Sequence, residues 1–232
     1  MNGSTDPLTR QMALSALTTE QFNLQSARIG TIAEANGRSS LYLGTLSSAT
    51  IAIAFIGQAH DLGDTFYLFA LILLPSVFLL GVFTYLRLVQ TSIEDYVFSL
   101  VSLRIREYFV EIDPAVTPFF PPTDVEGMKK LMRMGMVSTS PLQAFLTTAS
   151  MVASINAIVG GVAVALAVRS LLDASAVTSA WVGVLFGLVF EACFLLIGSR
   201  RFLKAVAVVP ELYPWHESGA VVWSARIQEK NR

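Results

Sequence analysis

Four long apolar runs alternate with more polar segments along this chain, and each run is close to the length of a membrane-spanning helix. The runs cover residues 41–59, 66–86, 144–168 and 176–199. A helix needs about 20 apolar residues to cross the hydrocarbon core of a bilayer. The pattern therefore predicts an all-α, polytopic membrane protein with four transmembrane helices arranged in two hairpins.

The apolar spacing also predicts that spans one and two continue as helices beyond the membrane. Thr18 and Gln21 fit a capping box ahead of span one, and a seam with three- and four-residue spacing follows at Phe22, Gln25, Ile29, Ile32 and Ala33. After span two, a wide apolar stripe runs to Asp113-Pro114, where the proline should end the helix. This stripe includes Ile93, Leu100, Ile105 and Phe109.

Such a wide stripe on a lone helix would expose a large apolar surface, so we expect something to cover it. One interpretation is that the two helical extensions pack against each other within one chain. The other is contact between subunits. The candidate residues for either contact, oligomer or stalk, are Ile93, Leu100, Ile105 and Phe109. We expect both the pairing and a homo-oligomer.

The distribution of charge predicts the topology. Fifteen of the sixteen Lys and Arg residues lie in segments 1–40, 87–143 and 200–232, and the links between the paired spans are almost free of them. Basic residues are concentrated on the cytoplasmic side of membrane proteins. We therefore expect a multi-pass protein of the cell inner membrane with both termini in the cytoplasm.

This topology divides the chain into five parts. They are a cytoplasmic tail and helix (1–40), a first membrane hairpin (41–87), a cytoplasmic stalk with a Pro-rich link and a basic amphipathic segment (88–143), a second membrane hairpin (144–199) and a cytoplasmic tail (200–232). The basic segment around 125–137 suits either the anionic inner leaflet or a short helix packed beneath the bundle.

Composition narrows the range of partners. Only 14% of the residues are charged, against about 25% in soluble domains, which makes the lipid bilayer the expected environment. The net charge of −1 argues against nucleic acid, because binding to phosphates needs a basic surface. A cytoplasmic protein that binds the stalk is the alternative partner to further copies of the chain.

Glu191 is the candidate functional residue within the membrane. It lies nine residues before Arg200, about 13 Å from that end at helical rise, and an acid at this depth usually faces protein or a water-filled cavity. Gly183, Gly187 and Gly198 share its face of the helix, which predicts contact with protein. Counting inward from each span end places Ser154, Asn156, Ser76 and Thr50 near the same level, as one polar layer from four spans.

Span three has the smallest side chains of the four. Two stripes of small residues run along it, and Gly160 and Gly161 lie one in each stripe. Small residues let helices approach closely in membranes. Span three is therefore expected to be the central helix, either in the bundle core or around an oligomer axis.

Known catalytic and cofactor motifs are missing from the sequence. It contains no Gly-rich phosphate loop, no HExxH and no GxSxG. The two histidines, His60 and His216, are predicted on opposite sides of the membrane, and Cys193 is the single cysteine. We therefore expect no cofactor, no metal site and no enzymatic activity.

Glu191 has two interpretations: it locks helices together through hydrogen bonds, or its polar layer lines an ion path. The function we expect is an oligomeric ion channel or membrane-perturbing effector. The alternative is a membrane-anchored structural or signalling adaptor that presents its helical stalk to a soluble partner.

The segments EQFNLQSARIGTIAEANGRSSLYLG and LVQTSIEDYVFSLVSLRIREYFVEIDP resemble those of uncharacterised bacterial four-span integral membrane proteins. In span count the chain is also loosely similar to the four-span effectors of bacterial nucleotide-signalling defence systems. Both resemblances imply a multi-pass membrane protein, and neither assigns a role to a particular residue.

Overall fold

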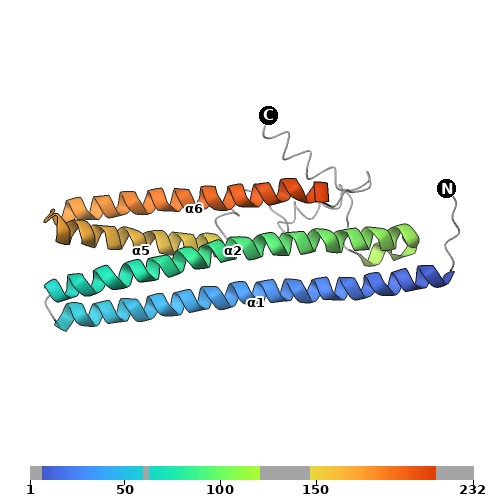
Figure 1. The fold of residues 1–232 in the computed structure, drawn as a ribbon, viewed down its shortest axis with the longest axis horizontal. Coiled ribbons are helices and arrows are strands. Elements are labelled where there is room, and N and C mark those ends of the chain that lie inside the picture. Colours follow the sequence, from blue (N-terminus) through green and yellow to red (C-terminus); the bar gives the residue numbers. More distant parts are fainter. Residues whose placement is uncertain (1–6, 60–62, 121–146, 213–232) are drawn as a thin grey trace, which may run out of the picture. The chain divides into compact units, whose positions relative to one another are not determined.

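A computed structural model describes residues 7–59, 63–120 and 147–212 of the chain. Every element in these ranges is a helix: α1 (Pro7–Ala59), α2 (Asp64–Ile112), the 3-10 helix η1 (Pro114–Phe119), α5 (Thr148–Leu171) and α6 (Ala176–Leu212) (Figure 1). Four of them are long and apolar enough to cross a membrane. The prediction of an all-helical chain with four such helices is confirmed.

The long helices run through two compact units, which are described separately below. Unit 1 comprises residues 1–32, 92–139 and 204–232, and unit 2 comprises residues 33–91 and 140–203. The basic segment around 125–137 and the tail from residue 213 lie outside the described residues.

The observed end of α2 agrees with the sequence prediction, whereas the observed start of α1 does not. α2 ends at Ile112, directly before Asp113-Pro114 as predicted. α1 begins at Pro7, earlier than the predicted capping box. The Thr18 hydroxyl donates to the carbonyl of Leu14, 2.8 Å away, so Thr18 lies inside the helix and does not cap its start.

Both α1 and α2 are longer than a membrane crossing requires. α1 has 53 residues, about 80 Å at 1.5 Å per residue, whereas the hydrocarbon core is about 30 Å thick. Its charged residues all precede position 41. The stretch of α1 whose composition suits the hydrocarbon is therefore its C-terminal third.

In unit 2, α5 contacts each of the other three helices. The hydroxyl of Tyr42 on α1 donates to Asn156 on α5, 3.2 Å away. A Cβ added at Gly160 would lie 2.6 Å from the Phe78 ring on α2. On its third side α5 packs against α6 through glycines, so in this unit α5 has the central place expected for span three.

Glycines allow α5 and α6 to approach closely. A Cβ at Gly161 would lie 2.7 Å from the carbonyl oxygen of Gly183, and one at Gly183 would lie 2.5 Å from that of Gly161. A Cβ at Gly187 would lie 3.1 Å from the oxygen of Ala157. Backbones this close leave no room for side chains, which explains the small residues at these positions.

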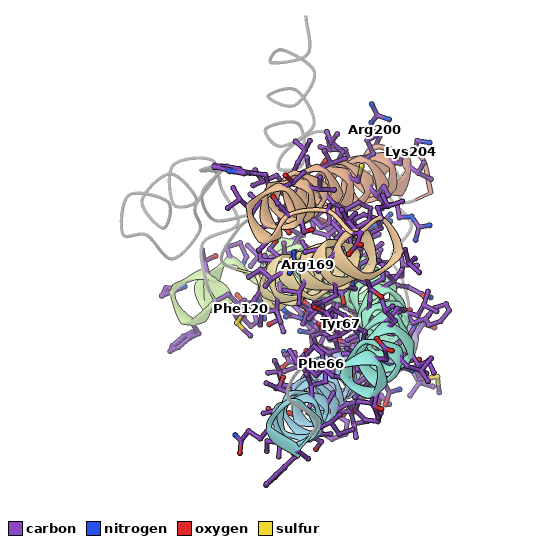
Figure 2. All side chains as sticks on the ribbon, turned by 90° about the vertical axis from the view of Figure 1, so that its left-hand side faces the viewer. Phe66, Tyr67, Phe120, Arg169, Arg200 and Lys204 are labelled. Carbon is purple, nitrogen blue, oxygen red and sulfur yellow. The ribbon has the colours of Figure 1, made fainter. Side chains whose placement is uncertain are left out.

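The short connection between α5 and α6 is held by local hydrogen bonds. Arg169, labelled in Figure 2, donates from Nη1 to the carbonyl of Ala174, 2.8 Å away. Asp173 has a φ of 52°, a left-handed conformation that Asp tolerates better than most residues. The Ser175 hydroxyl accepts from the backbone N–H of Thr178 at 3.1 Å and so caps the start of α6.

In unit 1, α1 and α2 contact each other through a ladder of polar side chains. Arg28 forms an ion pair with Asp95 at 2.8 Å, and the Gln21 amide donates to the Ser102 hydroxyl at 2.6 Å. Leu24 and Ile105 are buried. The side of α1 that faces α2 is therefore the one with Gln21, Leu24, Arg28 and Thr31.

This arrangement corrects the predicted seam on the α1 extension. Phe22, Ile29 and Ile32 were expected to face α2, but they are exposed. Of the four residues expected at an oligomer or stalk contact, Ile105 is 6% exposed and is buried within its own copy. Ile93, Leu100 and Phe109 are half-buried. The Arg28–Asp95 and Gln21–Ser102 pairs lie on a different side of α1, and this is the side that packs against α2.

Candidate intramembrane polar site

Glu191 and Ser154 meet where α6 packs against α5. The Ser154 hydroxyl donates to Oε1 of Glu191 over 2.8 Å, and its oxygen also lies 3.0 Å from the carbonyl of Ser150. Oε2 of Glu191 is buried and has no hydrogen-bond partner among the described residues. The carboxyl group therefore keeps acceptor capacity that one copy of the chain, as far as it is described, does not use.

The helix face predicted for Glu191 explains its position. Gly187, one turn earlier on α6, packs against Ala157, and Gly183, another turn earlier, packs against Gly161. Residues four apart lie on one side of a helix. The glycine contacts bring the backbones together, and Glu191 then reaches Ser154 at the next level.

A groove of about 520 Å³ runs between α5 and α6, and Glu191 and Ser154 form part of its wall. The remaining lining residues are small or aliphatic: Ala157, Ile158, Gly161, Val162, Ala165, Ala180, Gly183, Val184, Gly187 and Leu188. Ile158 and Leu188 are 66% and 65% exposed, so the groove opens at the surface of the unit. The carboxyl group therefore borders an open, otherwise apolar groove.

A second polar pair lies in the interior of unit 2. Tyr42 and Asn156 are both fully buried, at 0% exposed, and are joined by their hydrogen bond. Nδ2 of Asn156 has no partner among the described residues. A Cβ at Gly81 on α2 would collide with the Asn156 amide, so Gly81 provides the space that this side chain occupies.

The predicted layer from four spans is only partly present. Thr50 and Ser76 are exposed, and each donates to a carbonyl of its own helix, Leu46 and Ile72 respectively, at 2.8 Å. A hydroxyl bonded back to its own helix is already satisfied. Glu191 and Ser154, which were expected at one level, do meet. Position along a span does not determine which way a side chain faces, and Thr50 and Ser76 point away from this site.

Two tyrosines that the predicted polar layer does not include also belong to this polar interior. Tyr42 holds Asn156, and the Tyr85 hydroxyl makes a short hydrogen bond to the Phe194 carbonyl on α6. Gly198 faces Tyr85, not α5, because a Cβ there would collide with the hydroxyl. A tyrosine within an apolar run is a usable signal, since a buried hydroxyl usually needs a partner.

An ion-pair cluster lies near the charged ends of the predicted spans. Glu34 on α1 accepts from Arg87 on α2 at 2.8 Å for each of its oxygens, and from Arg38 at 2.8 Å. These hydrogen bonds, Arg87 first, lower the pKa of the Glu34 carboxyl to about 2. Bidentate pairing with Arg fixes orientation as well as charge, so this cluster sets the register of α1 against α2 in unit 2.

The described residues contain no group of three or more His, Cys, Asp or Glu side chains that could hold a metal ion. In comparisons with known proteins, no family model, no curated protein and no solved structure matches the chain. The class supported by the fold is an all-helical protein with four helices that can span a membrane. The function of the Glu191 site is inferred from its own geometry.

Proposed function

We propose that this chain is a non-enzymatic membrane protein that assembles into oligomers and lets ions cross the bilayer along a polar layer around Glu191. The observation that carries the proposal is the Glu191 carboxyl, which borders an open groove with Oε2 unpartnered among the described residues. An acid facing acyl chains costs a few kcal/mol even on lenient scales. Glu191 is only partly buried as a residue, and other copies that close the groove would keep its carboxyl group away from acyl chains.

An oligomer would gather several such carboxyl groups around one axis. Rings of acidic side chains attract cations in channels, and Ser154 adds a hydroxyl at the same level. The surrounding groove, about 520 Å³ and lined by small and aliphatic residues, would hold water and ions once other copies enclose it. The proposal therefore favours cations over anions.

The proposed location is the cell inner membrane, with both termini in the cytoplasm. The support is the concentration of basic residues in three segments of the sequence. Asp173, in the α5–α6 connection, is then outside the cell. A thiol introduced by Asp173→Cys in a Cys193→Ala background should react with an impermeant reagent on intact cells. Labelling only after the membrane is opened would contradict this orientation.

Ion flux in liposomes tests the function directly. Unmodified protein should conduct a small cation, and Glu191→Gln, which keeps a hydrogen bond and a similar volume, should fold normally but reduce flux at least severalfold. Cys193→Ala is the control, because Cys193 is exposed and lies two residues away. Absence of flux from well-folded protein would contradict the proposal and favour the adaptor function, with a soluble partner bound through residues 88–135.

A further inference from the structure

The groove between α5 and α6 is polar at one end and apolar along the rest of its length. Each helix contributes one row of lining residues at four- and three-residue spacing, so each row lies on one side of its helix. The rows are Ser154, Ile158, Val162 and Ala165 on α5, and Glu191, Leu188, Val184 and Ala180 on α6. The two polar residues meet at the same end, and alanines lie at the other. The groove is therefore amphipathic along its length.

The chain has no basic residue to balance the Glu191 carboxylate within the predicted spans. Glu191 is the single charged residue in the four apolar runs of the sequence. A second copy that covers the groove with its own spans therefore brings no positive charge to this level. Lipid headgroups lie at the bilayer surface, whereas Glu191 precedes Arg200 by nine residues, about 13 Å at helical rise. A counter-charge for the ionised carboxylate therefore has to come from a cation outside the protein.

The oxygen atoms at the polar end suit an ammonium group better than a bare metal ion. The side chains that line the groove supply three oxygens, two from Glu191 and one from Ser154. Calcium ions take about six to eight oxygen ligands in proteins, so these side chains alone would bind such an ion weakly. A primary ammonium group can donate one hydrogen bond to each of the three side-chain oxygens. Oε2 of Glu191 is free to accept one, since it has no partner among the described residues.

The apolar part of the groove suits an alkyl chain of limited length. From Glu191 to Ala180 the α6 row covers about 16 Å at helical rise. An extended carbon chain gains about 1.2 Å per bond, so a chain of about twelve carbons covers this length. Val184 and Leu188 are 53% and 65% exposed, and acyl chains of lipid can also cover them. The ammonium group therefore provides the selectivity, and the groove sets the length of the chain.

We propose that this groove binds a single-chain alkylammonium ion of about twelve carbons. The ammonium group lies at Glu191 and Ser154, and the chain points toward Ala165 and Ala180. The inference rests on the proposed function for an ionised Glu191 that cations reach, and it names an organic cation that the same site binds. Because the bound chain fills the groove, this cation should also block the proposed ion flux.

Photolabelling of the full chain in lipid nanodiscs tests the proposed site. The probe is dodecylammonium with a diazirine at the far end of its chain; its amine is protonated near pH 7, because primary amines such as that of lysine titrate near pH 10. The label should concentrate on residues 162–165 and 180–184. Dodecanol with the same diazirine is the uncharged control and should label these residues severalfold less. Equal labelling by the two probes would overturn the inference, because any apolar chain would then suffice.

Variants of the polar end give a second readout. Glu191→Gln should lower labelling by the ammonium probe to the level of the alcohol, whereas Cys193→Ala, at an exposed position outside the groove lining, should leave it unchanged. Full labelling of Glu191→Gln, or label concentrated elsewhere in the chain, would also overturn the inference. The comparison of the two probes uses unmodified protein, so it holds even if Glu191→Gln does not fold. Flux without this labelling would refute only the alkylammonium site, and labelling without flux would refute only ion conduction.

Discussion

Replacing Gly183 with alanine should loosen the contact between α5 and α6 that positions Glu191. The new Cβ would lie 2.5 Å from the carbonyl oxygen of Gly161 and 2.8 Å from the Cβ of Ala165. Ordinary contact begins near 3.4 Å, so the two helices must separate by about 0.9 Å. The obstruction is backbone on one side and a methyl group on the other, and neither can rotate away.

Overpacking of this size typically costs about 1–3 kcal/mol, partly offset by the higher helix propensity of alanine, about 1 kcal/mol. Gly44→Ala is the matched control, because a Cβ at Gly44 meets nothing within 4 Å. Gly187→Ala, whose Cβ would lie 3.1 Å from the Ala157 oxygen, should have an intermediate effect.

Thermal unfolding in detergent measures this series. At about 2–4 °C per kcal/mol for a chain of this size, Gly183→Ala should melt several degrees below Gly44→Ala, with Gly187→Ala between them. Gly183→Ala should also reduce flux, because Ser154 and Glu191 move apart with the helices. Equal melting temperatures for Gly183→Ala and Gly44→Ala would refute the close-packing argument.

Three further predictions concern the polar contacts between helices. The pKa of the Glu34 carboxyl is lowered to about 2, so the ionised group contributes fully to the free energy of unfolding above pH 4.5, and this contribution is lost as the pH falls toward 2. Glu34→Gln should therefore remove this part of the acid sensitivity in melting curves. Arg28→Asp should destabilise the protein by about 0.5–1 kcal/mol, since the pair is about one-third exposed, and adding Asp95→Arg should restore most of it. Tyr42→Phe and Asn156→Ala should each cost about 0.5–1.5 kcal/mol, and a double-mutant cycle should show that the two losses are not additive.

Much of the fold could be predicted from the sequence because apolar run length and proline position have direct physical consequences. Four spanning helices and the end of α2 at Ile112 follow from them. The start of α1 could not be located, because Thr18 and Gln21 are equally compatible with the interior of a helix. In α1, Thr18 bonds to Leu14 and Gln21 bonds to Ser102.

The candidate site was predicted in part for a similar reason. Glycine spacing indicated the face of Glu191, and depth indicated Ser154, because both depend on the geometry of single helices. The orientation of Thr50 and Ser76, and the exposed placement of Phe22, depend on which helix packs where. Hydrophobicity favoured Phe22 as a packing residue, but the Arg28–Asp95 and Gln21–Ser102 pairs select a different side of α1.

Thiol accessibility at Glu191 tests most directly whether water and ions reach this carboxyl group. Cys193 is the single native cysteine; it is exposed and lies two residues along α6, about 200° around the helix from Glu191. In liposomes, a charged thiol reagent should modify Glu191→Cys in a Cys193→Ala background and leave Cys193 of the unmodified protein intact. An uncharged, membrane-permeant reagent should modify both. If the charged reagent fails at Glu191→Cys, or modifies both thiols equally, the polar path proposed here is wrong.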